Sequence, residues 1–277
     1  MPKGISLHIG VNVVDVNHYG NENRLRGCHN DASAMQKIAD KQQFKSNILL
    51  DEEATTDNVI PLITEAANTL QAGDMFFITY SGHGGQVADV SGDEGGNDET
   101  LCLFNREYRD DEFNSALAHF KSGVRILWIS DSCHATNNFK NLEDEADESD
   151  APPPPRTIGL DQSMEVLKKN PDVYEVWLKD GDLSVANAPE IPASLVQLAA
   201  CKEEQLSGDA FKDDPNPKGV FTTRLLKIWD DGAFSGTYQD LIDEIVQLIP
   251  KHWNQTPQMV QSGSMEKGFA KQKPFTI

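Results

Sequence analysis

The sequence predicts an α/β protein with a mainly parallel central sheet and helices on both faces. Short apolar runs of the kind found in buried strands recur along the chain, and stretches with helical apolar spacing lie between them. Alternation of strands and helices favours parallel pairing, because each crossover helix returns the chain to the same end of the sheet. The chain has 277 residues, 38% of them hydrophobic, which is enough for one large core.

The expected strands are short runs of mostly apolar residues. They are Ile5–Val14, Met75–Tyr80, Val124–Ile129 and Leu195–Ala200, with a weaker candidate at Ile48–Leu50. The expected helices show apolar residues at intervals of three and four. They are Ala32–Ala39, Val59–Leu70, Phe221–Trp229 and Tyr238–Ile249, with Asp57 or Asn58 able to cap the second and Pro250 ending the last.

One segment differs in composition from the rest. Residues 141–150 (NLEDEADESD) hold six acids in ten positions, and Pro152–Pro155 follow them. Such a segment buries little apolar surface, so we expect it to be extended or disordered, as a solvated surface insertion would be. It divides the chain into a larger part (1–140), an acidic, proline-rich linker or insertion (141–190) and a smaller part (191–277) of one compact domain.

Charge and cysteine usage narrow the function classes. With 44 acidic and 24 basic residues the net charge is −20, so nucleic acids and anionic membranes are repelled, although a solvated acidic surface needs no partner at all. We find neither a signal peptide nor an apolar run of the roughly 18 residues that a membrane span needs. The four scattered cysteines favour reduced thiols, and we expect a cytoplasmic protein.

A cysteine follows the third expected strand in ILWISDSCHAT (126–136). Chemistry in parallel sheets gathers beyond the carboxyl ends of strands, and Cys133 lies at such an end. A lone cysteine is more often an inert buried residue, so a reactive one needs a base. His134 is its neighbour, but adjacent side chains at a strand end diverge. His83 ends the neighbouring strand in MFFITYSGHGGQ (75–86) and is the better partner.

Cys133 and His83 together form a candidate dyad for acyl transfer. The thiolate would attack a carbonyl carbon, and the histidine would protonate the leaving amine. Gly82, Gly84 and Gly85 allow backbone N–H groups to approach the carbonyl oxygen closely.

YSGHGG (80–85), followed 50 residues later by DSCHA (131–135), resembles the motifs of the metacaspases, caspase-like cysteine peptidases of bacteria, plants, fungi and protists. Five further segments are similar to that family in the same order: LRGCHNDA (25–32), GDEGGNDETL (92–101), LAACKEEQLSGD (198–209), GVFTTRLL (219–226) and NQTPQ (254–258). The resemblance implies a caspase-like sandwich with a large, p20-like part at 1–140 and a small, p10-like part at 191–277. Within the family the chain resembles the bacterial orthocaspases. The resemblance also implies a monomer, because metacaspases resemble monomers more than the dimeric caspases do.

The resemblance also implies roles for single residues. His83 would be the general base and acid, Cys133 the nucleophile and Gly84 N–H an oxyanion donor. The primary specificity pocket would be lined by Cys28, Asp31, Ser81 and Asp131. Two carboxylates in one pocket favour a substrate arginine or lysine. Taken singly, Asp31 also suits a helix N-cap, Asp131 a loop cap and Cys28 ordinary packing.

Calcium activates several metacaspases, and the resemblance places oxygen ligands at Asp98, Asp110 and Asp111. This chain departs from the family, because Lys140 stands where a further aspartate is usual and Ala135-Thr136 where Ser-Gly is common. The alternative to a calcium site is that these acids lie in solvated surface loops and bind no metal. The chemistry itself requires no cofactor, so calcium is expected only as an activator.

The linker is where caspase-like proteins are often cut. Arg156 lies just after Pro152–Pro155, and we expect it to be exposed and to suit a peptidase that is specific for basic residues. We therefore expect a zymogen that is cleaved after Arg156, by itself or by an upstream activating protease. Lys140, Lys168 and Lys169 are other sites.

The sequence thus predicts a cysteine endopeptidase that cuts protein or peptide substrates after arginine or lysine. Two alternatives remain. One is a catalytically silent caspase-like scaffold, against which the presence of both dyad residues counts. The other is a small-molecule hydrolase on a similar sheet, whose pocket would be apolar rather than acidic.

Overall fold

A computed structural model describes residues 2–88, 97–133, 151–179, 190–264 and 268–277. Its core is a six-stranded sheet in the order β2-β1-β3-β7-β8-β9. These strands are β1 (Gly4–Gly10), β2 (Lys45–Leu50), β3 (Met75–Ser81), β7 (Arg125–Asp131), β8 (Ser194–Ala199) and β9 (Gln258–Gly263). All neighbours pair in parallel except β8 and β9, which are antiparallel. The mainly parallel α/β fold predicted from the sequence is confirmed.

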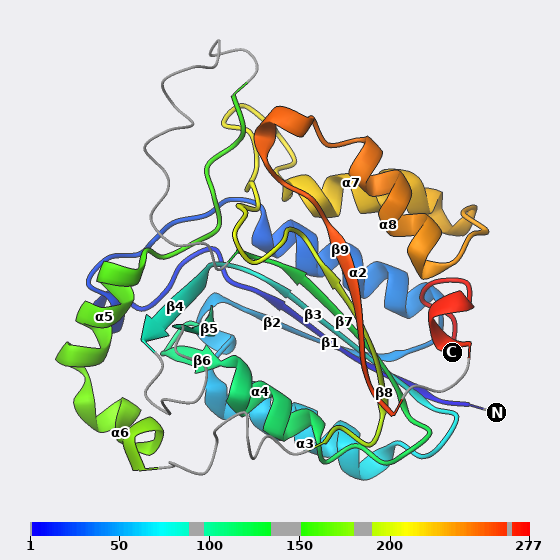
Figure 1. Cartoon of the computed structure of the whole chain (residues 1–277), viewed down its shortest axis with the longest axis horizontal. Coiled ribbons are helices and arrows are strands. Elements are labelled where there is room, and N and C mark those ends of the chain that lie inside the picture. Colours follow the sequence, from blue (N-terminus) through cyan, green and yellow to red (C-terminus); the bar gives the residue numbers. More distant parts are fainter. Residues whose placement is uncertain (1, 89–96, 134–150, 180–189, 265–267) are drawn as a thin grey trace.

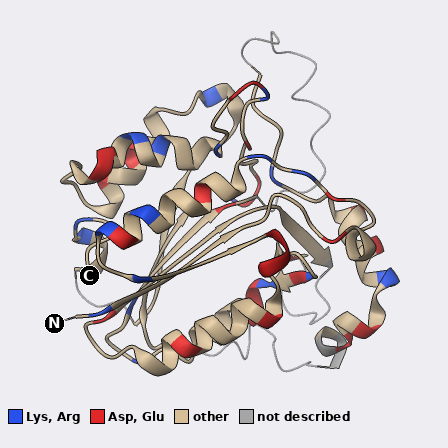
Figure 2. Cartoon of the chain, turned by 180° about the vertical axis from the view of Figure 1, so that it is seen from behind, with Lys and Arg blue, Asp and Glu red and all other residues tan. Residues whose placement is uncertain are grey.

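Helices cover both faces of this sheet (Figure 1). On one face lie α2 (Cys28–Lys41), α7 (Val220–Trp229) and α8 (Tyr238–Gln247), and on the other lie α3 (Thr56–Thr69) and α4 (Asp110–Leu117). Every residue of β1, β3 and β7 is buried, as expected of parallel strands covered on both sides. The strands carry few charged residues, and acidic and basic side chains lie mostly on helices and loops (Figure 2).

A small antiparallel sheet stands beside the main one. It consists of β4 (Gly84–Ala88), β5 (Asn97–Cys102) and β6 (Glu107–Arg109) in that order. A four-residue helix, α1 (Val16–Tyr19), lies in the loop after β1. Neither this sheet nor the antiparallel strand β9 was predicted from the sequence, because their segments are short, rich in polar residues and without a clear apolar period.

The region after the proline run, the later part of the predicted linker or insertion (141–190), contains helices, whereas an extended or disordered chain was expected only of the acidic run and the prolines. It forms α5 (Leu160–Lys169) and α6 (Pro171–Lys179). Four residues of this region are buried in the hydrophobic cluster between the main sheet and helices α3 and α4: Ile158, Val166, Tyr174 and Trp177. The acidic run 141–150 lies outside the described residues. No helix in the described part of the chain has the length and apolar character needed to cross a bilayer.

Candidate active site

The two predicted reactive residues follow neighbouring strands of the sheet. β3 and β7 pair in parallel with Ser81 opposite Asp131, so His83 and Cys133 each come two residues after a matched pair. Parallel strands end at the same edge, and this places the two motifs side by side. The prediction that the two motifs would meet at one edge of the sheet therefore agrees with the observed register.

A segment of the chain itself occupies this edge, and we call residues 153–158 the strap. The strap pairs with the loop after β8, because Arg156 N–H donates to Ser207 O at 2.9 Å and Asp209 N–H donates to Pro154 O at 2.7 Å. Beyond Arg156, Ile158 N–H donates to Gly84 O at 2.8 Å. The strap is thus held by backbone hydrogen bonds on both sides of Arg156, as an extended peptide is held by a receptor strand.

The carbonyl group of Arg156 lies between the segments that carry His83 and Cys133. Its oxygen accepts hydrogen bonds from Gly84 N–H at 3.0 Å and from Cys133 N–H at 3.2 Å. Two backbone donors that converge on one carbonyl oxygen have the geometry of an oxyanion hole. The carbonyl belongs to the Arg156–Thr157 peptide bond, so this bond lies where a reacting bond would lie.

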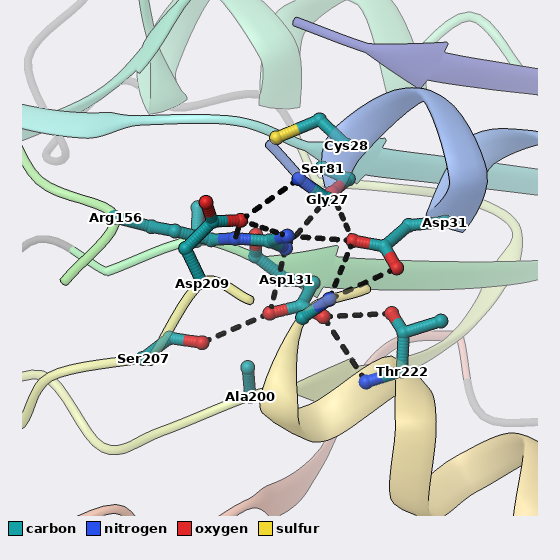
Figure 3. Close-up of polar contacts among 12 residues, drawn as sticks. Gly27, Cys28, Asp31, Ser81, Asp131, Arg156, Ala200, Ser207, Asp209 and Thr222 are labelled. Carbon is teal, nitrogen blue, oxygen red and sulfur yellow. Dashed lines mark hydrogen bonds and ion pairs between the residues drawn. The ribbon is translucent and has the colours of Figure 1, made fainter. Parts of the chain in front are cut away.

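The side chain of Arg156 enters an acidic pocket below the strap (Figure 3). Its guanidinium nitrogens lie 2.7 Å from Asp31 Oδ2, 3.1 Å from Asp131 Oδ1 and 2.9 Å from Asp209 Oδ1. The Ser81 hydroxyl accepts a further hydrogen bond at 2.8 Å. Arg156 has no solvent-exposed surface, which corrects the expectation that it is exposed. Proline-rich composition suggested a solvated linker, but three carboxylates and the backbone pairing hold this residue inside.

Other residues fix the pocket carboxylates in place. Asp131 accepts hydrogen bonds from the Ser207 hydroxyl at 2.9 Å and from the hydroxyl and N–H of Thr222 at 2.7 and 3.1 Å. Asp31, in the first turn of α2, accepts from Ser81 Oγ at 2.8 Å and from Gly219 N–H at 3.1 Å. Burial raises the pKa of Asp31 to about 6 even though the positive charge of Arg156 opposes that shift.

Cys28 also borders this pocket, as the first residue of α2 (Figure 3). It is completely buried, and burial raises the pKa of its thiol well above the ordinary value while the nearby charge of Arg156 opposes this. All four residues expected to line the pocket therefore surround one guanidinium. Asp209, Ser207 and Thr222 were missed, although the matched segments 198–209 and 219–226 contain them. Asp209 follows Ser207 and Gly208, and an acidic residue after Ser-Gly, considered alone, indicates only a turn.

His83 is held in a defined orientation. Its Nε2 lies 2.8 Å from Asn23 O, an oxygen that can only accept, so the hydrogen-bond network assigns the proton to Nε2 and leaves Nδ1 unprotonated. Nδ1 is buried without a hydrogen-bond partner among the described residues. Burial lowers the pKa of His83 to about 4, and the backbones of Asn23 and Thr157 oppose that shift. A neutral imidazole with a bare nitrogen can serve as a base.

Cys133 is completely buried beneath the strap. Burial raises the pKa of its thiol to about 12, although the backbones of Ser207 and Arg156 oppose that shift. Within the described part of the chain its sulfur has one hydrogen-bond contact, 4.0 Å from Ser207 O, and none with His83. The thiol is therefore protonated and unactivated while the strap is in place.

The acids expected to bind calcium lie near the small sheet. Asp98 forms an ion pair with Arg109 at 3.2 Å. Burial and the charges of Asp111, Glu99 and Asp98 raise the pKa of Asp110 to about 7. Within the described residues, however, no group of three or more His, Cys, Asp or Glu side chains is arranged to hold a metal ion. Lys140 and the Ala135-Thr136 pair lie outside the described residues, whereas Lys168 and Lys169 are exposed at the end of α5.

Comparisons with known proteins identify the family and the fold of this chain. A family model described as the caspase domain matches residues 11–268. Metacaspase-1 of Schizosaccharomyces pombe is 24% identical over 304 residues, covering 93% of this chain and 68% of that protein. Metacaspase-7 of Arabidopsis thaliana is 27% identical over 156 residues, covering 52% of this chain and 39% of that protein. Protein GSU0716 of Geobacter sulfurreducens has a solved structure that superposes with a TM-score of 0.86 at 36% identity, covering 100% of this chain and 99% of that one.

Proposed function

Because the chain belongs to the caspase-domain family and is a metacaspase-like cysteine peptidase, we propose that it cuts proteins and peptides after arginine or lysine. One observation carries this proposal. Arg156 lies in a buried pocket with three carboxylates, and its own carbonyl oxygen lies on the N–H groups of Gly84 and Cys133. The strap thus occupies the site in the manner of a bound substrate with a basic residue before the reacting bond.

The proposed reaction uses the residues around that carbonyl. His83 Nδ1 takes the thiol proton as the Cys133 sulfur attacks the carbonyl carbon, and the N–H groups of Gly84 and Cys133 stabilise the oxyanion. When the C–N bond breaks, His83 returns the proton to the leaving amine and a thioester remains. Water then attacks the thioester with His83 as base, releasing the new carboxylate and restoring the thiol.

The strap supports a zymogen-like state. Arg156 fills the specificity pocket, Cys133 is a buried thiol under it, and substrates cannot enter while it stays there. We propose that hydrolysis between Arg156 and Thr157, by the chain itself or by a partner peptidase, accompanies activation. The part before the cut is then free to leave, whereas Ile158, Tyr174 and Trp177 anchor the part after it in the core.

Calcium is a second proposed element of activation. The supporting observation is electrostatic, because mutual repulsion among Asp98, Glu99, Asp110 and Asp111 contributes to the raised pKa of Asp110, and a divalent cation would relieve it. The described acids do not by themselves form a metal-binding group, so no catalytic step is assigned to the ion.

Fluorogenic peptides that differ only in the residue before the reporter test the proposal. We expect hydrolysis after arginine and lysine, and at least about a hundredfold less after aspartate, because an acidic side chain would add a charge to a pocket that already holds three carboxylates. Each peptide is measured with calcium and with a chelator, and gels of the same samples report cutting of the chain. Hydrolysis of apolar esters without hydrolysis of basic peptides would favour a small-molecule hydrolase instead. Peptide hydrolysis by a chain that stays full length would contradict activation by cleavage.

A further inference from the structure

Building on the proposed peptidase function, we infer that the specificity pocket selects arginine over lysine and that Asp209 makes the selection, with Gly27 and Gly219 as the walls that admit a guanidinium. Asp31 and Asp131 attract any cationic side chain by charge. Asp209 differs from them because it contacts the one nitrogen that arginine has part-way along its side chain.

The contacts of Arg156 distinguish the two edges of its guanidinium (Figure 3). On one edge, Nε and Nη2 lie 3.2 and 2.9 Å from the same oxygen, Oδ1 of Asp209. On the far side, Nη2 also reaches Asp31 at 2.7 Å, and Nη1 reaches the Asp131 main-chain oxygen at 3.1 Å. Each of the three nitrogens therefore has at least one acceptor.

A lysine ammonium cannot reproduce this pattern. It has a single nitrogen at the tip of a flexible stem, so it cannot reach the far carboxylates and also replace Nε beside Asp209. At least one of the two contacts with Asp209 is lost. Loss of one hydrogen bond between charged groups in a buried site weakens binding by about tenfold to a hundredfold.

Asp209 is held in position independently of the strap's side chain. Its Oδ2 accepts from Arg26 N–H at 2.8 Å and its Oδ1 from Gly27 N–H at 3.1 Å. Burial alone would raise the pKa of the Asp209 carboxyl, but Arg156 and these two N–H groups hold it below the usual value. The carboxylate is thus ionised and oriented toward Nε by the backbone just before α2.

Two glycines leave room for the flat guanidinium. A Cβ at Gly27 would lie 2.6 Å from Arg156 Nη2 and 2.9 Å from Asp209 Oδ1. A Cβ at Gly219 would lie 2.6 Å from Arg156 Nη1 and would overlap Asp131 Oδ2. Their φ angles, −90° and −56°, are open to any residue, so the lack of a side chain provides space rather than a special backbone conformation.

Peptides ending in arginine, lysine or citrulline before the reporter test this inference on the activated enzyme. Citrulline has nearly the shape of arginine without its charge. We expect kcat/KM for arginine to exceed that for lysine by about tenfold or more, with citrulline below both. Asp209→Asn should reduce the arginine-to-lysine ratio by about tenfold, and Gly27→Ala should lower arginine hydrolysis more than lysine hydrolysis. Asp213→Asn, the same change at an exposed position nearby, should leave the ratio unchanged.

Equal rates for arginine and lysine in the wild-type enzyme, or an unchanged ratio in Asp209→Asn, would overturn the inference while leaving the peptidase function intact. A second measurement does not depend on catalysis. In an uncut Cys133→Ala chain, Arg156→Lys should lower the Tm, and the fall should be smaller when Asp209→Asn is also present. Equal falls in the two backgrounds would mean that Asp209 does not distinguish the two side chains, even if the enzyme cuts no peptide at all.

Discussion

Substitution of Cys133 by alanine is expected to lower hydrolysis of arginine peptides by a factor on the order of 10⁴ or more, because loss of the nucleophile leaves only binding and the oxyanion donors. The fold should survive, since Cys133 is a small buried residue whose sulfur has one weak contact within the described structure, with Ser207 O. Peptide kinetics and a thermal melt of the same sample separate the two effects.

Cys201→Ala is the matched control for this variant. Cys201 is another buried cysteine, whose sulfur lies 3.6 Å from the main-chain oxygen of Ser132, the residue before Cys133. Its sulfur contacts the main-chain oxygens of Ser132 and Gln205 and none of the groups bound to the Arg156 carbonyl, so we expect its loss to leave kcat/KM within about threefold, in line with the modest cost of most single substitutions. Loss of activity in Cys201→Ala with full activity in Cys133→Ala would reverse the assignment of the nucleophile.

Removing the guanidinium from the pocket should have the largest effect on stability. In a Cys133→Ala chain, which cannot cut itself, Arg156→Gln leaves Asp31, Asp131 and Asp209 without their cation. Breaking a buried ion pair from one side costs about 3–5 kcal/mol, or roughly 10 °C in Tm for a domain of this size. If the strap leaves the pocket, water reaches the three carboxylates and their burial cost disappears. Release of the strap therefore limits how much free energy of unfolding is lost.

This loss should depend on pH in a defined direction. The pKa of Asp31 is already raised to about 6 beside Arg156, and it rises further once that charge is gone. A carboxyl whose folded pKa lies above its unfolded value destabilises the fold at higher pH, and protonation at lower pH relieves the cost. The fall in Tm should therefore be larger at pH 8 than at pH 5. Arg24→Gln, at an exposed arginine paired with Glu22, is the control and should change Tm little at either pH. A pH-independent fall would contradict burial of the charged cluster.

Much of the site could be predicted from the sequence because it lies at strand ends. His83 and Cys133 follow long apolar strands, and parallel strands that are neighbours must deliver both to one edge. Asp31 and Asp131 could be assigned to the pocket only through the family resemblance, since each alone also suits a local capping role. The fold class followed from the alternation of strands and helices, whereas the small polar strands β4 to β6 gave no periodic signal.

The position of Arg156 and the partners of the pocket could not be predicted in the same way. Its burial depends on three carboxylates from distant segments and on pairing of the strap with residues 207–209, and such long-range contacts leave no local pattern. The helices after the strap did carry a signal, because Val166, Tyr174 and Trp177 are apolar residues spaced along short helical stretches. The neighbouring acidic and proline-rich composition masked that signal.

The most direct test is the identity of the bond that is cut when the wild-type chain becomes active. Mass spectrometry and N-terminal sequencing of the activated protein should find a fragment that begins at Thr157, and none should form in Cys133→Ala incubated alone. An active enzyme in which the Arg156–Thr157 bond is intact, or one cut only after Lys168 or Lys169, would show that the strap is not bound as a substrate.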